Sequence, residues 1–277
     1  MRIDAHHHLW HYNPERDGWI TEDMRAIRAD FTPYDLLREL KTNEMDGSVV
    51  VQADPSETET AFLVDIADRH DFVRGVVGWI DLCSPYAAER LQFYKNTAPK
   101  LKGFRHIVQS EPDDRFLLRD DFCRGLALLR PYDYTYDILI YPRQLPAALE
   151  LVERFPEQAF VIDHLAKPNI RGSVMEPWTK QMQALAAHPN VWCKVSGMVT
   201  EANWAHWRQE DFTPYLDVIF AAFGPERLLF GSDWPVCLVA ATYGEVKQIV
   251  LTYMAGQGAE AIAGVMGENA KRFYHLQ

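Results

Sequence analysis

The chain has 277 residues, of which 48% are hydrophobic and 24% charged, a globular composition that excludes disordered and fibrous proteins. Its 39 acidic and 28 basic residues give a formal net charge of -11, which disfavours nucleic acid and anionic membranes as partners. The four cysteines form no CxxC pattern, and no apolar stretch has the length of a signal peptide or membrane span. These features predict a cytoplasmic protein with reduced thiols.

Short apolar segments rich in β-branched residues alternate with stretches of helical spacing along the chain. This alternation predicts parallel strands joined by helices. We expect eight strands, at residues 2–6, 47–52, 73–80, 101–107, 134–140, 159–164, 191–196 and 228–233. Apolar residues spaced three and four apart predict helices at residues 58–69, 85–95, 145–154, 176–187, 214–223 and 243–256.

The same alternation would permit an open doubly wound sheet. The residues at the ends of the predicted strands distinguish the two folds. In a parallel barrel the catalytic groups come from the C-terminal ends of several strands. Polar and aromatic side chains follow most of the predicted strands: His6, His8, Gln52, Asp54, Trp79, Asp81, Arg105, His106, His164, Ser196 and Asp233. We therefore predict an α/β fold, a single-domain (β/α)8 TIM barrel spanning residues 1–277. Residues 9–31 are expected to form a loop over its mouth.

Three consecutive histidines close the first predicted strand. The strand period of two places His6 and His8 on one face and His7 on the other. Neutral imidazole is the commonest protein ligand for zinc and similar ions, so this pair could meet one divalent metal ion. A frayed terminus or the remnant of an affinity tag is the alternative. The strand-like neighbours and the shortness of the run favour a functional pair.

The sixth and eighth predicted strands each end in a titratable residue. His164 follows an apolar run and should face the barrel mouth, although a buried histidine bonded to a backbone carbonyl is the alternative. Asp233 follows Gly231, a glycine that allows close backbone approach, and is the best candidate for a general base. A structural helix cap is the alternative for this aspartate.

Other residues at the predicted rim could contact a substrate. Arg105 could clamp a carboxylate or carbonyl oxygen, with a surface ion pair as the alternative, and His106 follows it. The faces of Trp10, Trp79 and Trp234 would suit sugar rings, although core packing explains them nearly as well.

Adjacent residues on the seventh predicted strand face opposite sides. Either Cys193 or Lys194 must therefore point into the barrel, and the pattern does not say which. The chain has no GxSxG elbow, no P-loop and no GxGxxG turn opening a helix after a strand. Serine hydrolase, nucleotide hydrolase and dinucleotide-binding functions therefore lack support.

The segments DAHHHLW, DHLAKP, VWCKVSGMVTEA and FGSDWPVC resemble the amidohydrolase superfamily of the amidohydrolase-2 type. They resemble in particular its sugar-lactonase branch, the L-fuconolactonase-like proteins, and the similarity runs nearly end to end. The resemblance implies an ester hydrolase that opens a lactone of a sugar acid, such as an L-fucono- or L-rhamnonolactone. It places His6, His8, His164 and Asp233 where relatives bind a divalent metal. The bridging carboxylated lysine or carboxylate of binuclear members has no convincing counterpart here. At most one ion is expected, zinc first, and a metal-independent reaction stays open.

Lactone hydrolysis requires a base for water and positive charge for the oxyanion. We expect Asp233 to take the proton, and a metal ion or His164 and Arg105 to polarise the carbonyl. The alternative on the same barrel is a metal-dependent decarboxylase of an unsaturated or aromatic acid. Such an enzyme should clamp a carboxylate with several cations, and only Arg105 is placed at the rim. A noncatalytic binding barrel would leave the strand-end histidines and aspartate unused.

Overall fold

Strands and helices alternate along the computed structural model, which describes residues 1–277. The strands are β1 (Ile3–His7), β2 (Gly47–Val51), β3 (Val73–Gly78), β4 (Leu101–His106), β5 (Thr135–Ile138), β6 (Phe160–Ile162), β7 (Val191–Val195) and β8 (Leu228–Phe230). The α-helices are α1 (Pro33–Thr42), α2 (Glu57–Arg69), α3 (Ala87–Thr97), α4 (Asp120–Leu126), α5 (Leu145–Arg154), α6 (Trp178–Ala186), α7 (Gln209–Phe223), α8 (Tyr243–Tyr253), α9 (Ala259–Ala263) and α10 (Asn269–Phe273).

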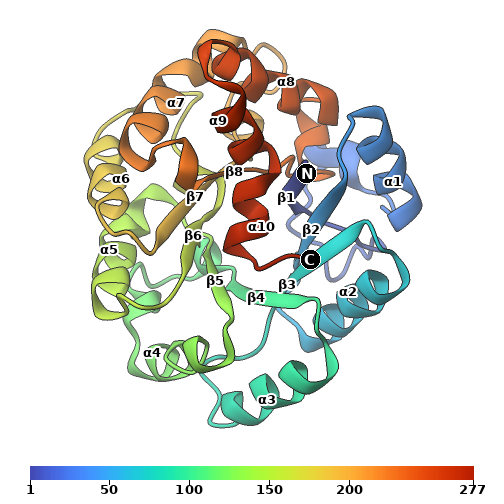
Figure 1. Cartoon of the computed structure of the whole chain (residues 1–277), viewed down its shortest axis with the longest axis vertical. Helices are drawn as coiled ribbons and strands as arrows, with labels where there is room; N and C mark the ends of the chain where they lie inside the picture. The colour runs from blue at the N-terminus through green and yellow to red at the C-terminus, as the bar shows by residue number, and fades with distance from the viewer.

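The eight strands form one parallel sheet in which each strand pairs with the next in sequence. The sheet closes where β8 returns to β1. There the backbone N–H of Asp233 donates to the carbonyl of His6 at 2.8 Å, and that of His8 donates to the carbonyl of Trp234 at 2.7 Å. The helices surround the strands in a ring (Figure 1). The predicted single-domain TIM barrel is confirmed, and the open doubly wound sheet is excluded.

All eight predicted strands exist, but most end earlier than the apolar pattern indicated. The largest difference falls at β8, predicted to reach residue 233, and β6, predicted to reach residue 164, also ends early. His164 has φ 53° and Asp233 has φ 56°, in the left-handed region that interrupts a strand. These side chains therefore stand on turns beyond the last ladder bonds rather than on the strands.

The six predicted helices are present as α2, α3 and α5 to α8, and four short helices were missed. One of them, α1, carried a sequence signal. The side chain of Asp35 accepts from the backbone N–H of Thr32 at 3.0 Å, and Pro33 occupies the first helical position. Helix α7 begins five residues before its predicted start at Pro214, because Asp211 caps the backbone N–H of Arg208 at 2.8 Å.

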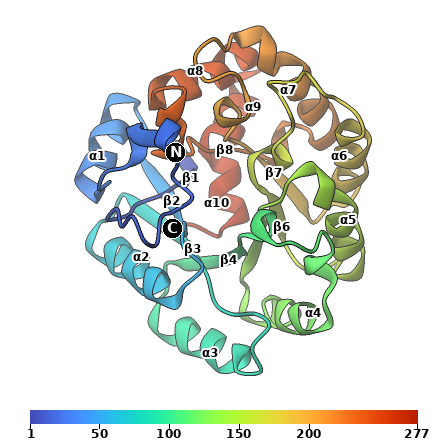
Figure 2. The same cartoon turned by 180° about the vertical axis from the view of Figure 1, so that it is seen from behind.

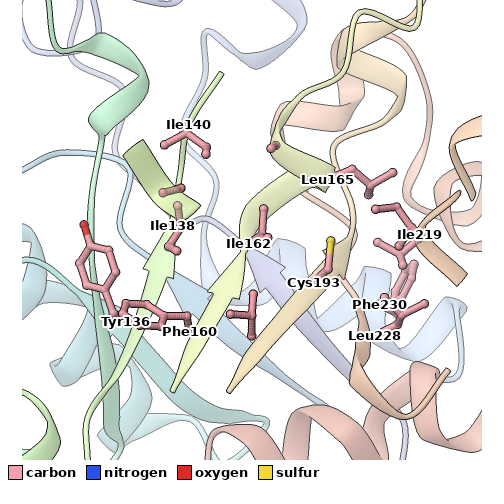
Figure 3. Close-up of a cluster of buried hydrophobic side chains, with 14 of the residues drawn as sticks. Tyr136, Ile138, Ile140, Phe160, Ile162, Leu165, Cys193, Ile219, Leu228 and Phe230 are labelled. Carbon is pink, nitrogen blue, oxygen red and sulfur yellow. The ribbon is translucent and has the colours of Figure 1, made fainter. Parts of the chain in front are cut away.

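Two apolar layers hold the barrel. The larger lies between the strands and the surrounding helices. Figure 3 shows part of it, with Phe160, Ile162 and Cys193 on the strands and Ile219 on α7. The smaller layer fills the N-terminal end of the barrel with side chains that include Val161 and Leu229.

The end of the chain closes the barrel at that N-terminal end. The side chains of Phe273, Tyr274 and Leu276 belong to the interior layer, and α10 runs across this end of the barrel (Figure 1). The open question on the seventh strand is also answered. Cys193 packs toward the helices, whereas Lys194 points into the barrel and is completely buried. The opposite end of the barrel is not covered by this segment.

Candidate active site

A cavity of about 360 Å³ opens at the C-terminal ends of the strands. This end faces the viewer in Figure 2, where the dark blue chain that follows β1 crosses it. Five residues predicted for the site line the cavity: His8, Arg105, His106, His164 and Asp233. His6 does not line the cavity and is completely buried.

Three imidazoles surround one carboxylate oxygen in this cavity. The Oδ1 atom of Asp233 lies 3.9 Å from Nε2 of His6, 3.4 Å from Nε2 of His8 and 3.9 Å from Nε2 of His164. The Nε2 atoms of His6 and His8 are 3.3 Å apart. The structure therefore brings together the four residues that the sequence predicted to share one centre.

A bulge in β1 accompanies this placement. The pairing advances from Asp4 to His7 on β1 while it advances only from Ser48 to Val50 on β2, so β1 contains one extra residue. The ring of His7 lies outside the cavity, and neither of its nitrogens has a hydrogen-bond partner. Burial lowers the pKa of His7 to about 3, so this ring is neutral.

Hydrogen bonds fix the orientation of the rings that line the cavity. Nδ1 of His8 lies 2.8 Å from the carbonyl of Val51, so this nitrogen donates and Nε2 presents a lone pair. Nδ1 of His164 lies 2.9 Å from Oγ of Ser196. A Cβ atom at Gly197 would stand 2.4 Å from Nδ1 of His164, so only glycine leaves room for this ring.

The turn that carries Asp233 is tied back to the first strand. The carboxylate of Asp4 accepts from the backbone N–H of Ser232 at 2.9 Å and from its hydroxyl at 2.6 Å. Burial raises the pKa of Asp4 to about 6, against these hydrogen bonds. The contact fixes the turn beside the histidines of β1.

The electrostatics of the cavity favour an ionised carboxylate and neutral imidazoles. Burial acts to raise the pKa of Asp233, but His164, His8 and Lys167 together hold it below its usual value. Burial lowers the pKa of His164 to about 4. At neutral pH the cavity therefore contains a proton acceptor beside the uncharged ring of His164.

A buried charge network lies beneath His6. Nζ of Lys194 is 2.5 Å from Oδ2 of Asp137, 2.9 Å from Oδ1 of Asp163 and 3.0 Å from Nδ1 of His6. Burial acts to raise the pKa of Asp163, yet Lys194, His6 and Arg105 hold it well below its usual value. The sequence analysis did not identify Asp137 or Asp163 as part of the site. The one sequence feature that pointed to a buried partner was Lys194, a lysine in an apolar strand.

Arg105 links this network to the cavity. Its Nη1 donates to Oδ2 of Asp163 at 2.9 Å and lies 3.3 Å from Nε2 of His6, while Nη2 bonds to the carbonyl and side chain of Gln52. The side chain is buried, so the surface ion pair considered as an alternative is excluded. Its guanidinium stands at the cavity wall in a fixed position.

None of the three tryptophans predicted to face the substrate lines the cavity. Trp10 and Trp234 are buried in the apolar packing beneath the residue 9–31 segment, on either side of Phe31. Trp79 donates to Nδ1 of His106 at 3.1 Å and so supports a cavity residue rather than forming a wall. The indole that does line the cavity is Trp19, from the loop expected over the mouth.

Two further cations that sequence reasoning missed also line the cavity. Arg16 is paired with Asp17 at 2.7 Å, and Lys167 stands 4.0 Å from Glu201. The sequence argument against a carboxylate clamp assumed Arg105 as the only cation at the rim, and that assumption is wrong. Both additional cations come from segments outside the predicted strands, where a period-two pattern gives no information on direction.

The donor set fits one divalent metal ion. Donor atoms of His6, His8 and Asp233 lie within 4.8 Å of one another, a set that zinc accepts, and Nε2 of His164 lies 3.9 Å from Oδ1 of Asp233. A second group, formed by His6, Asp163 and His164, shares two of these histidines, and its aspartate is already bound by Lys194 and Arg105. The structure therefore contains donors for a divalent ion.

Comparison with known proteins agrees with this fold. A family model described as Amidohydrolase matches residues 3–276, and the chain belongs to this family. The chain is 39% identical to an L-fucono-1,5-lactonase of Burkholderia multivorans and 38% identical to one of Burkholderia ambifaria, over 100% of this chain and 96% of each relative. A crystal structure of an amidohydrolase from Burkholderia multivorans with bound zinc superimposes with a TM-score of 0.96, at 38% identity over 100% of both chains. The protein is thus a hydrolase of the amidohydrolase superfamily.

Proposed function

We propose that this hydrolase opens the ester ring of a sugar-acid lactone, with L-fucono-1,5-lactone as the first substrate to test and L-rhamnonolactone as the second. The relatives named as L-fucono-1,5-lactonases support this substrate class. The observation that carries the proposal is the joint presence of an ionised carboxylate, Asp233, and a fixed guanidinium, Arg105, in one cavity of small-molecule size.

In the proposed reaction Asp233 accepts a proton from a water molecule, which attacks the lactone carbonyl. The guanidinium of Arg105 and the ring of His164 stabilise the oxyanion of the tetrahedral intermediate. The ester C–O bond of the ring then breaks, and the proton held by Asp233 passes to the departing alkoxide. The product is one open-chain hydroxy acid, because the leaving group stays attached to the same molecule.

The residues that would hold a metal ion are His6, His8, His164 and Asp233. A bound divalent ion would supply Lewis acidity toward the carbonyl and lower the pKa of a bound water molecule.

The upper cavity wall offers partners for the hydroxyl groups of a sugar. Asp54, Gln109 and Glu111 present polar side chains there, and Trp19 presents an apolar face. Nε2 of His106 lies 2.7 Å from Glu111 and is fixed as a donor, because its Nδ1 accepts from Trp79. In this proposal, His106 orients the carboxylate of Glu111 toward a substrate hydroxyl. We propose that Trp19 makes the contact with the sugar ring that the sequence had suggested for Trp10, Trp79 and Trp234.

A pH-indicator screen of sugar-acid lactones tests the function. The screen uses chelator-treated and zinc-supplemented protein, and subtracts the spontaneous opening of each lactone. We expect catalysed acid release from at least one aldonolactone. Catalysed release of carbon dioxide from aromatic or unsaturated acids, with no lactone opened, would favour a decarboxylase instead. The screen includes these acids because Arg16 and Lys167 could bind a substrate carboxylate.

The substitution Asp233→Asn tests the base. It keeps the shape of the side chain and removes the proton acceptor, so kcat/KM should fall by about 10²–10⁴-fold. The control is Asp68→Asn, at an exposed position on α2, which should leave kcat/KM unchanged. Unchanged turnover in Asp233→Asn would remove the proposed base.

A further inference from the structure

Four consecutive residues in the left-handed backbone conformation follow β6. The φ angles are 53° at His164, 54° at Leu165, 56° at Ala166 and 51° at Lys167, in a region that residues with a Cβ atom rarely adopt. The backbone N–H of Lys167 donates to the carbonyl of His164 at 2.7 Å and closes this turn. Unfavourable backbone conformations of this kind persist only where the surrounding structure imposes them, and they cluster at functional sites.

The turn separates its two inner side chains from the two at its ends. Leu165 and Ala166 are completely buried in the apolar layer between strands and helices, where Figure 3 shows Leu165. The carbonyl of Leu165 accepts from the indole of Trp178 at 2.7 Å, which anchors the turn. The side chains of His164 and Lys167 both line the cavity. The strained turn therefore places a histidine and a lysine, three residues apart, in the same cavity.

The ammonium group of Lys167 has no hydrogen-bond partner. Its Nζ lies 4.0 Å from Oε1 of Glu201 and 5.5 Å from the centre of the Tyr141 ring, and both distances are too long for a hydrogen bond. Only 17% of the side chain is exposed. An ammonium group carries three donors, and their withdrawal from water is unfavourable unless another group accepts from them. A ligand in the cavity could supply that acceptor.

The two arginines that line the cavity differ from Lys167 in this respect. Nε and Nη2 of Arg16 both donate to the carboxylate of Asp17 at 2.7 Å. Nη1 of Arg105 donates to Asp163 at 2.9 Å, and its Nη2 donates to the side chain of Gln52 at 3.2 Å. Among these three cations, Lys167 is therefore the one whose charged group is free to bind an anionic ligand.

We propose that Lys167 binds the carboxylate of the open-chain hydroxy acid that lactone opening produces. Opening converts a neutral ring into an anion, and an ammonium group with free donors favours the anion. The charge of Lys167 also helps to hold the pKa of Asp233 below its usual value, so it acts in the part of the cavity to which the reaction is assigned. This role of Lys167 rests on the proposed function, and it predicts inhibition by the accumulating acid.

Isothermal titration calorimetry with the open-chain acid of L-fucono-1,5-lactone measures this contact without turnover. Lys167→Met should bind the acid about 10–100-fold more weakly, because a charge-assisted hydrogen bond is lost. Lys167→Arg keeps the charge and should retain most of the affinity. The neutral alditol, which has the same hydroxyl groups and no carboxylate, should show no dependence on Lys167.

Two further variants separate ligand binding from a structural role. Glu201→Gln removes the neighbouring carboxylate and keeps Lys167, so it should bind the acid at least as tightly as the unmodified protein. Equal weakening in Glu201→Gln and Lys167→Met would identify a structural ion pair instead. Lys180→Met, at an exposed position on α6, makes the same chemical change away from the cavity and should leave the affinity unchanged.

The outcomes for Lys167 and for the lactonase are distinguishable. Unchanged affinity of folded Lys167→Met for the acid, or no measurable binding of the acid to the unmodified protein, would overturn the role of Lys167 even if lactones are opened. Lys167-dependent binding of the acid by a protein that opens no lactone would count against the proposed function alone. If Lys167→Met does not fold, Lys167→Gly takes its place, because glycine adopts a positive φ without strain.

Discussion

The pKa values of two buried aspartates, Asp137 and Asp233, shift in opposite directions. Burial raises the pKa of Asp137 to about 6 despite its contact with Lys194. Burial also acts on Asp233, but three surrounding groups, His164, His8 and Lys167, reverse its effect. Both carboxylates are buried, so the difference in their neighbours accounts for the opposite directions of the two pKa shifts.

The low pKa of the proposed base predicts the pH dependence of activity. Asp233 acts when deprotonated, so activity should be lost only as the pH falls through its lowered pKa, and His164 titrates nearby at about 4. After subtraction of spontaneous opening, kcat/KM should be flat between about pH 6 and 8 and fall in acid. The measurement is a pH profile with a rapidly opened lactone. If kcat/KM instead fell to half its plateau value near neutral pH as the pH is lowered, the proton acceptor would be a group other than Asp233.

Glycine at position 231 is required by the close approach of β1. A Cβ atom there would lie 2.6 Å from Cβ of His6 and 3.1 Å from Cβ of Ser196. Gly231→Ala should displace His6, and displacements of about 1 Å can reduce turnover by about 10²-fold. The control is Gly256→Ala, where nothing lies within 4 Å. Measurement of kcat/KM for both variants, with folding checked by circular dichroism, tests the packing; full activity in Gly231→Ala would show that β1 can move aside.

The loop between β2 and α2 depends on one buried carboxylate. Glu59 on α2 accepts from the backbone N–H of Ala53 at 3.0 Å and from that of Asp54 at 2.5 Å. Both residues line the cavity, so the helix fixes part of its wall. Burial raises the pKa of Glu59 to about 7, against these two hydrogen bonds.

This raised pKa makes stability depend on pH at the level of the element. The folded state binds the Glu59 proton more tightly than the unfolded state, so its stabilising contribution is present below the unfolded pKa and is lost as the pH rises toward 7. Glu59→Gln can accept the same two hydrogen bonds without this loss. Its unfolding free energy relative to the unmodified protein should therefore rise between about pH 4.5 and 7, by up to about 3 kcal/mol.

Urea denaturation at several pH values measures this difference. Glu89→Gln, at an exposed position on α3, is the control and should show no such trend. A relative stability of Glu59→Gln that does not change across this range would show that the carboxylate remains ionised in the folded protein.

At the scale of the whole molecule, the two ends of the barrel have separate tasks. The C-terminal ends of the strands surround the cavity, and the end of the chain closes the opposite side. Tyr274 connects the two, because its hydroxyl donates to Oδ2 of Asp137 at 2.7 Å, and Asp137 in turn binds Lys194 beneath His6.

Truncation of the apolar plug should lower stability more than activity. Leu276 is buried in the interior layer, and Leu276→Ala should reduce the unfolding free energy by about 2–4 kcal/mol through lost burial and the cavity left behind. Val174→Ala, at an exposed site, is the control. Chemical denaturation measures the change, and lactonase activity assayed well below the melting temperature should stay similar. A proportionate loss of kcat/KM would show that the plug also positions the site.

The local pattern of residues was sufficient to predict the fold and to select His6, His8, His164 and Asp233 as residues at the strand ends. Alternating apolar segments predicted eight strands, and a period of two separated His7 from its neighbours. These features depend on residues close together in sequence, where strand geometry relates spacing to direction. The strand ends at β6 and β8 were placed too far along the chain, because an apolar run does not reveal the left-handed turns that begin at His164 and Asp233.

Tertiary structure alone decided what those residues touch. The interaction of Lys194 with Asp137, Asp163 and His6 joins β7, β5, β1 and the turn after β6, and it depends on barrel closure, which no local spacing encodes. The same holds for the cavity wall, where Trp19 lines the site and the predicted tryptophans do not. Directions along one strand follow from its repeat, whereas contacts between strands depend on how the closed sheet brings distant residues within a few ångströms.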